Sequence, residues 1–169
     1  MKRVCYAALM VSSAAVAAGL DVTPARTEAA GYAITHGLVV ANLVRNCRPF
    51  QDRIGEDLDA ALAGWRERNA ERAAAAESYL VYARAAIERQ YGEPAAHDFD
   101  AQTRSVFRHK ANVALNDIFE RMSPQFGVCA RWASAIAQGR ADLDWESKYL
   151  NTLDELVAFE RRLRGGGEK

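Results

Sequence analysis

Three histidines, at positions 36, 97 and 109, are the side chains of this 169-residue chain best suited to proton transfer or metal binding. Their spacing excludes two histidines one turn apart on a helix, the pair that holds zinc in many metalloenzymes. His36 lies in an apolar stretch, where burial lowers the pKa of an imidazole. His97 is expected in a loop and His109 on a polar helix face. We therefore keep His36 as the ligand candidate; the alternative is a core histidine that is hydrogen-bonded to a neighbour.

Asp52, Glu56 and Asp59 are spaced so that their carboxylates share one face of a helix. Glycosidases and metal-binding bundles use facing carboxylates, but theirs point into a cleft or a core. These three lie opposite the apolar positions of the same segment, so a solvated helix face is expected. No nucleophile motif, calcium loop or phosphate-binding glycine loop is present in the sequence. The sequence therefore predicts no catalytic residue, no metal ligand and no cofactor.

Residues 1–19 have the pattern of a secretory signal peptide. Lys2 and Arg3 precede an uncharged run, and small residues follow where signal peptidase requires them, which predicts cleavage after Ala18 or Gly19. An uncleaved membrane anchor is the alternative, but the run is shorter than the ~20 residues that span a bilayer. The abundance of Ala and Arg is typical of a bacterium with a GC-rich genome. We expect export to the periplasm or out of the cell, with no membrane anchor after cleavage.

Cleavage changes the cysteine count from three to two, because Cys5 lies in the signal peptide. Cys47 and Cys129 remain, and an oxidising compartment favours their pairing. Both lie on apolar stripes of their helices, so a disulfide would join the end of one helix to another helix inside the core. The alternative is two separate buried thiols, each packed as a small hydrophobic side chain.

The rest of the chain has helical periodicity, is rich in good helix formers and shows no strand alternation. The predicted fold is an all-α, single-domain bundle of five to six helices over residues 20–164, followed by a flexible glycine-rich tail, 165–169. The first helix carries no charge between Gly31 and Val44, so it is expected to be central. The expected helices cover 23–47, 50–69, a stretch to Tyr91, a span from Asp98 or Asp100 to 122, then 123–139, and a last helix after Asp142 or Asp144 that includes Leu163.

Two details of this reading stay open. The second and third helices could be one continuous rod, with Asn69 as a possible stop. Trp65, Trp132 and Trp145 each lie on an apolar helix face, where they anchor a core or line a ligand groove.

Composition leaves two classes of function. The chain has 22 basic and 22 acidic residues and is 50% hydrophobic, which argues against a nucleic-acid partner and against disorder. The sequence favours a non-enzymatic interaction protein (accessory subunit, inhibitor, immunity protein or envelope-stress factor) whose partner is another envelope or secreted protein. The alternative is a carrier of a small ligand or metal, or a small enzyme, with a site around His36 and the aromatic side chains. A concave apolar pocket near His36 would favour the alternative, and a large exposed apolar patch the first class.

Overall fold

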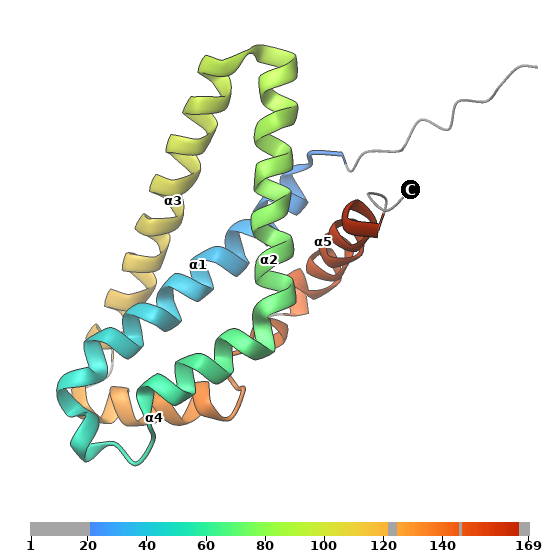
Figure 1. Ribbon diagram of the computed structural model, residues 1–169. Helices are drawn as coiled ribbons and strands as arrows, with labels where there is room; N and C mark the ends of the chain where they lie inside the picture. Colours follow the sequence, from blue (N-terminus) through green and yellow to red (C-terminus); the bar gives the residue numbers. More distant parts are fainter. Residues whose placement is uncertain (1–20, 122–124, 146, 166–169) are drawn as a thin grey trace, which may run out of the picture.

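The computed structural model describes residues 21–121, 125–145 and 147–165 (Figure 1). Within these ranges the chain forms five α-helices, two short 3-10 helices and no strand, so the predicted all-α bundle is confirmed. The predicted signal peptide, the expected helix start at 123 and residues 166–169 lie outside the described residues. The elements are α1 (Pro24–Cys47), η1 (Arg48–Arg53), α2 (Leu58–Tyr91), α3 (Glu93–Glu120), α4 (Gln125–Ala137), η2 (Leu143–Trp145) and α5 (Ser147–Gly165).

Helices α1 and α2 share the centre of the bundle, since each contacts all four other α-helices. The uncharged sequence predicts such a place for α1 alone. Helix α1 contacts α2, α3, α4 and α5, because apolar side chains leave it on almost every side. Thr23 caps its N-terminus by accepting a hydrogen bond from the Arg26 backbone N–H (3.3 Å), and Pro24 fills the first position, where no N–H donor is needed. Ala29 and Ala33 are buried on its core side, and their small side chains let neighbouring helices approach closely.

Helix α2 is one continuous helix of 34 residues, about 50 Å long. Asn69 is therefore not a stop. Its side chain is buried, donates to the Trp65 carbonyl oxygen (2.8 Å) and accepts from the Leu143 backbone N–H (2.8 Å). A buried amide is tolerated inside a helix when its hydrogen bonds are satisfied in this way.

The predicted start of the second helix at Phe50 is wrong. Residues 48–53 form the separate turn η1, and α2 begins at Leu58. Asp57 caps it by accepting from the backbone N–H groups of Asp59 (2.9 Å) and Ala60 (3.0 Å). The apolar spacing continues through the turn, so periodicity alone misses a start that the aspartate cap sets.

Helices α2 and α3 form the long antiparallel hairpin that rises to the top of Figure 1. One residue, Gly92, joins them with a φ of +87°, a conformation that favours glycine because it has no Cβ. Helix α3 begins at Glu93, so the predicted start near Asp98 or Asp100 is wrong. Pro94 lies in the first helical turn, where a proline is well tolerated, rather than in a loop.

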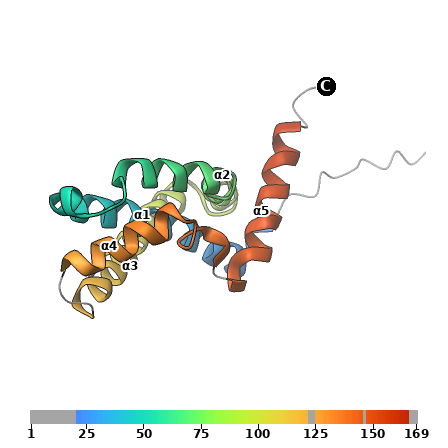
Figure 2. The ribbon, with the colours of Figure 1, turned by 90° about the horizontal axis from the view of Figure 1, so that it is seen from below.

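Two apolar stripes end earlier than the sequence predicts. Tyr91 at the end of α2 is 66% exposed, and Leu163 near the end of α5 is 53% exposed. Both lie past the last buried residues of their helices. Helix α5 packs against α1 and α2 through Leu153, Leu156 and Phe159. Figure 2 shows α5 at one end of the bundle, with α4 and the last turns of α3 at the other.

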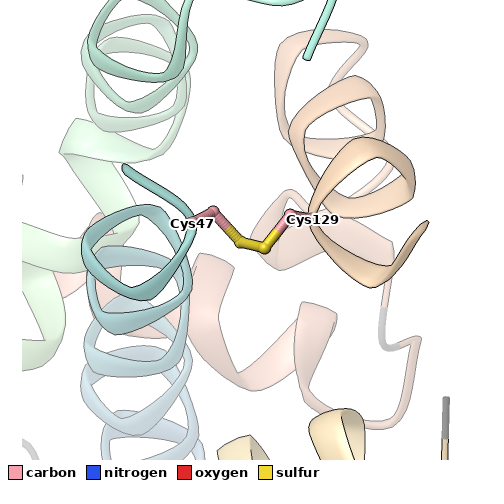
Figure 3. The surroundings of a disulfide bond; sticks show 2 residues. All are labelled: Cys47 and Cys129. Carbon is pink, nitrogen blue, oxygen red and sulfur yellow. A yellow bond between two sulfur atoms is a disulfide. The ribbon is translucent and has the colours of Figure 1, made fainter. Parts of the chain in front are cut away.

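Cys47 and Cys129 form the predicted disulfide, which joins the C-terminal end of α1 to α4 (Figure 3). Their Cα atoms lie 5.3 Å apart, and both side chains are buried in the main core. The bond closes a loop with a sequence separation of 82 residues. It therefore connects α4 to α1 through a covalent bond as well as through packing.

We predict that loss of this disulfide lowers the free energy of unfolding by up to about 4–5 kcal/mol, the chain-entropy value for a separation of 82 residues. The measurement is urea unfolding of the oxidised protein with and without a reductant. The double variant Cys47→Ala/Cys129→Ala is the control, because its unfolding must not respond to the reductant. A wild-type midpoint that reduction leaves unchanged would contradict the prediction.

Candidate ligand-binding groove

A groove of about 960 Å³ lies between α1 and α3, and Trp132 of α4 and Tyr149 of α5 complete its lining. This volume is at the upper end of the range for small-molecule sites, roughly 300–1,000 Å³. Most of the lining is apolar or aromatic, from Val22, Pro24, Gly31, Tyr32, Val39, Phe99, Val106, Phe107, Ala114, Ile118, Trp132 and Tyr149. The other lining residues are Thr23, Thr27, Glu28, Thr35, His36, Gln102, Thr103 and Lys110.

The groove follows one stripe of each helix. On α1 the lining positions recur every three or four residues from Pro24 to Val39, which is about 22 Å of helix at ~1.5 Å per residue. The same spacing runs along α3 from Phe99 to Ile118. Helix α1 uses its other stripes, including Ala33 and Val40, to pack into the main core. The stripe that lines the groove is the side of α1 that faces α3.

Gly31 is where the Phe107 ring of α3 lies against the α1 backbone. A Cβ atom placed on Gly31 would lie 2.6 Å from Cε1 of the Phe107 ring, nearer than real Cβ atoms approach other atoms. Only glycine therefore allows the ring to lie against the α1 backbone. Phe107 lines the groove but is only 9% exposed, in keeping with the close approach of its ring to α1.

His36 uses one ring nitrogen for the fold. Its Nε2 lies 2.7 Å from the Ala141 carbonyl oxygen and donates to it, because a carbonyl only accepts. Burial lowers the pKa of His36, and the weaker opposing effects are the hydrogen bond to Ala141 and the charge of Asp142. The ring is therefore neutral near pH 7, and its Nδ1 is an acceptor. No described residue donates a hydrogen bond to Nδ1, so the core-histidine interpretation holds for Nε2 while Nδ1 remains available to a ligand.

Thr35, the neighbour of His36, also lines the groove. Its hydroxyl oxygen is buried and makes no hydrogen bond with any described residue. A buried hydroxyl without a partner costs about 1–3 kcal/mol. The Thr35 side chain would have to rotate towards the groove before a polar atom of a bound molecule could remove that cost.

Charged groups of α1, α3 and α5 border the groove. Glu28 Oε1 accepts from the Tyr149 hydroxyl (2.7 Å) and from Lys148 Nζ (3.0 Å), and these contacts hold the pKa of the Glu28 carboxyl below its usual range. The Tyr149 ring stacks on that of Tyr32, with centroids 4.6 Å apart. Lys110 on α3 also lowers the pKa of Glu28 through its charge, but it forms no ion pair with a residue that the structure describes.

The turn between α4 and α5 supplies the partners that the sequence analysis missed. Asp142 accepts hydrogen bonds from Arg68 Nε (2.7 Å) and from Asn69 Nδ2 (3.0 Å). The bond between Asp142 and Arg68 raises the pKa of the Arg68 guanidinium. Arg68 also donates to the Ile136 carbonyl oxygen (2.6 Å) at the end of α4. The Ala141 oxygen, already bonded to His36, accepts from Trp65 Nε1 as well (2.7 Å). The sequence marks Asn69 only as a possible helix stop, and nothing in the sequence indicates its part in this network.

The predicted carboxylate face does not exist. Asp52 lies in η1 and Glu56 in the segment before α2, so neither shares a helix with Asp59. Asp59 is exposed and pairs with Arg48 (2.7 Å). The error follows from the wrong helix start.

The other two histidines lie away from the groove, and the described tryptophans lie partly in the core and partly in the groove lining. His97 lies in α3 rather than in a loop; it is exposed, and its Nδ1 lies 3.9 Å from Asp98 Oδ1. His109 is exposed on α3, as expected. Trp65 is buried in the core, whereas Trp132 lines the groove. The Trp145 side chain lies outside the described part of the chain.

Within the described ranges, no group of three or more His, Cys, Asp or Glu side chains is arranged to hold a metal ion. No helix in the same ranges is both long enough and apolar enough to cross a membrane. No protein-family model, curated protein or solved structure matches the chain. The function must therefore be inferred from the groove itself.

Stability is expected to depend on His36 at acidic pH. Its folded-state pKa is lowered, whereas the unfolded chain titrates near the ordinary value of 6.5, so the unfolded state binds more protons as the pH falls. The free energy of unfolding should therefore be highest above about pH 6.5 and decline as the pH falls towards the folded-state pKa. Urea unfolding on both sides of this pH measures the effect.

Two variants isolate the contribution of His36. His36→Gln can still donate an amide N–H to Ala141 but does not titrate, so its stability should vary less with pH than that of the wild type. His109→Gln removes an exposed histidine of α3 and should retain the wild-type pH dependence. Equal pH dependence in His36→Gln and the wild type would show that burial of this ring is not the cause.

Proposed function

We propose that this protein is a binding protein that holds a small, largely apolar ligand in the groove between α1 and α3. The observation that carries the proposal is the groove itself, with a volume of about 960 Å³ and an apolar lining interrupted by a few polar groups. Thr35, whose hydroxyl is unpartnered, and His36 both belong to that lining. A concave apolar pocket with a few converging polar groups is the usual form of a small-molecule site.

The position of the exposed apolar side chains supports this class over the interaction protein that the sequence favoured. Outside the groove, large exposed hydrophobic side chains include Val81 on α2, Val113 on α3 and Leu163 on α5. Single apolar side chains of this kind are ordinary on protein surfaces. These scattered side chains do not favour a protein-binding surface, so binding to another envelope or secreted protein is the alternative function rather than the main proposal.

Binding without catalysis is the simplest role for the groups in the groove. The Glu28 carboxylate is held by Tyr149 and Lys148, and the His36 Nε2 by a backbone carbonyl. A general base needs an unoccupied atom within hydrogen-bond reach of a nucleophile. The Thr35 hydroxyl makes no hydrogen bond to the neighbouring imidazole or to any other described residue, so the two do not form such a pair.

We propose further that the protein is exported to the periplasm or out of the cell. The disulfide supports this, because such bonds persist in oxidising compartments, and so does the pattern of residues 1–19. N-terminal sequencing of the protein recovered from a periplasmic extract tests the proposal. A chain that begins at Gly19 or Leu20 is the expected result, and a chain that retains Met1 would count against it.

Two valines of α3 offer a matched test of the groove. Val106 and Val113 are each 46% exposed, but only Val106 lines the groove. The neutral dye N-phenylnaphthylamine, which fluoresces more strongly in apolar sites, serves as the probe. Val106→Trp fills part of the groove and should raise the Kd of the dye about tenfold or more, a loss of about 1.4 kcal/mol. Val113→Trp adds the same indole outside the groove and should change the Kd less than about twofold.

The outcome separates the groove from general surface hydrophobicity. Equal effects of the two substitutions would mean that the dye binds elsewhere on α3. No binding of the dye by the wild type would remove the support for a small-molecule site.

A further inference from the structure

More positive than negative charges lie beside the groove. Glu28 and Lys110 line it, and Lys148 binds Glu28 at its edge. The single carboxylate is thus shared by a lysine ammonium and the Tyr149 hydroxyl, and the second lysine is left without an ion pair among the described residues. These groups carry a net charge of about +1 near pH 7.

The sequence of α3 extends the same positive field. Between Asp100 and Asp117 the helix has no acidic residue, and it carries Arg104, Arg108 and Lys110. None of these three cations forms an ion pair with a residue that the structure describes. Only Lys110 is part of the groove lining, so a negatively charged group on a ligand would have its direct contact there.

Apolar side chains extend along the groove from Lys110. Ala114, Ile118 and Trp132 lie beyond it in one direction and Val106 and Phe99 in the other. A hydrocarbon chain along this surface is stabilised because apolar area is removed from water. The groove therefore combines a long apolar surface with one cation that forms no ion pair with a described residue.

We propose that the ligand is an anionic amphiphile, a monomeric long-chain carboxylate whose head group pairs with Lys110 and whose hydrocarbon chain lies against the apolar lining. This inference rests on the proposed function and adds the ligand class to it. A neutral chain would use the apolar lining but not the lysine, and a cationic head group would meet more positive than negative charge. The long apolar lining beside Lys110 distinguishes this site from one for a free inorganic anion.

Displacement of N-phenylnaphthylamine from the full chain tests the proposal, with laurate and lauryl alcohol as competitors below their aggregation concentrations. Laurate should displace the dye at a lower concentration than the alcohol. Lys110→Gln should weaken displacement by laurate about three- to tenfold, the range of a partly exposed ion pair, and leave displacement by the alcohol unchanged. Arg108→Gln removes an exposed cation of α3 outside the lining and should have less than about a twofold effect.

Each other outcome has a definite meaning. Equal displacement by acid and alcohol, unaffected by Lys110→Gln, would overturn the anionic head group and leave the apolar groove intact. Failure of the dye itself to bind would overturn the proposed function instead. Binding only to phosphatidylglycerol vesicles, and not to monomeric laurate, would overturn the inference in favour of a membrane surface. Concentration-dependent dimerisation that Val106→Trp abolishes would overturn it in favour of a second copy in the groove.

Discussion

The buried turn between α4 and α5 is the constraint on which the rest of the bundle depends. Backbone polar groups are seldom buried without partners, so this turn needs donors and acceptors from other helices. The Ala141 carbonyl accepts hydrogen bonds from the ring N–H groups of His36 in α1 and Trp65 in α2. Asp142 accepts a hydrogen bond from the guanidinium of Arg68. These bonds require α1 and α2 to lie side by side at the level of the turn, and they determine where α4 ends and α5 can begin.

The groove follows from that arrangement. Helix α4 is held on one side by the Cys129 disulfide and at its other end by the turn, and Trp132 lies between the two attachments. Helix α5 leaves the turn so that Tyr149 stacks on Tyr32 of α1. The two aromatic side chains thus reach the groove because the elements that carry them are fixed elsewhere. The opposite side, α3, is positioned by the contact of Phe107 with the α1 backbone.

His36 and Thr35 lie on the part of α1 that lines the proposed binding groove. The imidazole gives its Nε2 hydrogen to the fold and presents the other nitrogen as an acceptor, while the adjacent hydroxyl remains unsatisfied. Protein cores rarely leave such atoms without partners, and the exceptions concentrate at sites that bind something. The apolar surface of α1 exceeds what the core covers, and the remainder faces α3 across the groove. The stripe of α1 that lines the groove is thus the part of this helix that the core leaves uncovered.

The sequence by itself determined the helical class and the internal place of α1, because these depend on composition and local periodicity. It also predicted the pairing of Cys47 with Cys129 from the two cysteines left after the signal peptide, and the structure decided this against two separate thiols. The sequence placed the starts of two helices wrongly, since Asp57 and Gly92 set those boundaries by local geometry that an apolar stripe does not encode. Only the tertiary structure decided what His36 bonds to, 105 residues away at a backbone carbonyl that has no sequence signature. It alone also decided which stripe of α1 faces α3, because every side of α1 is apolar enough to pack and the choice depends on competition among all the helices.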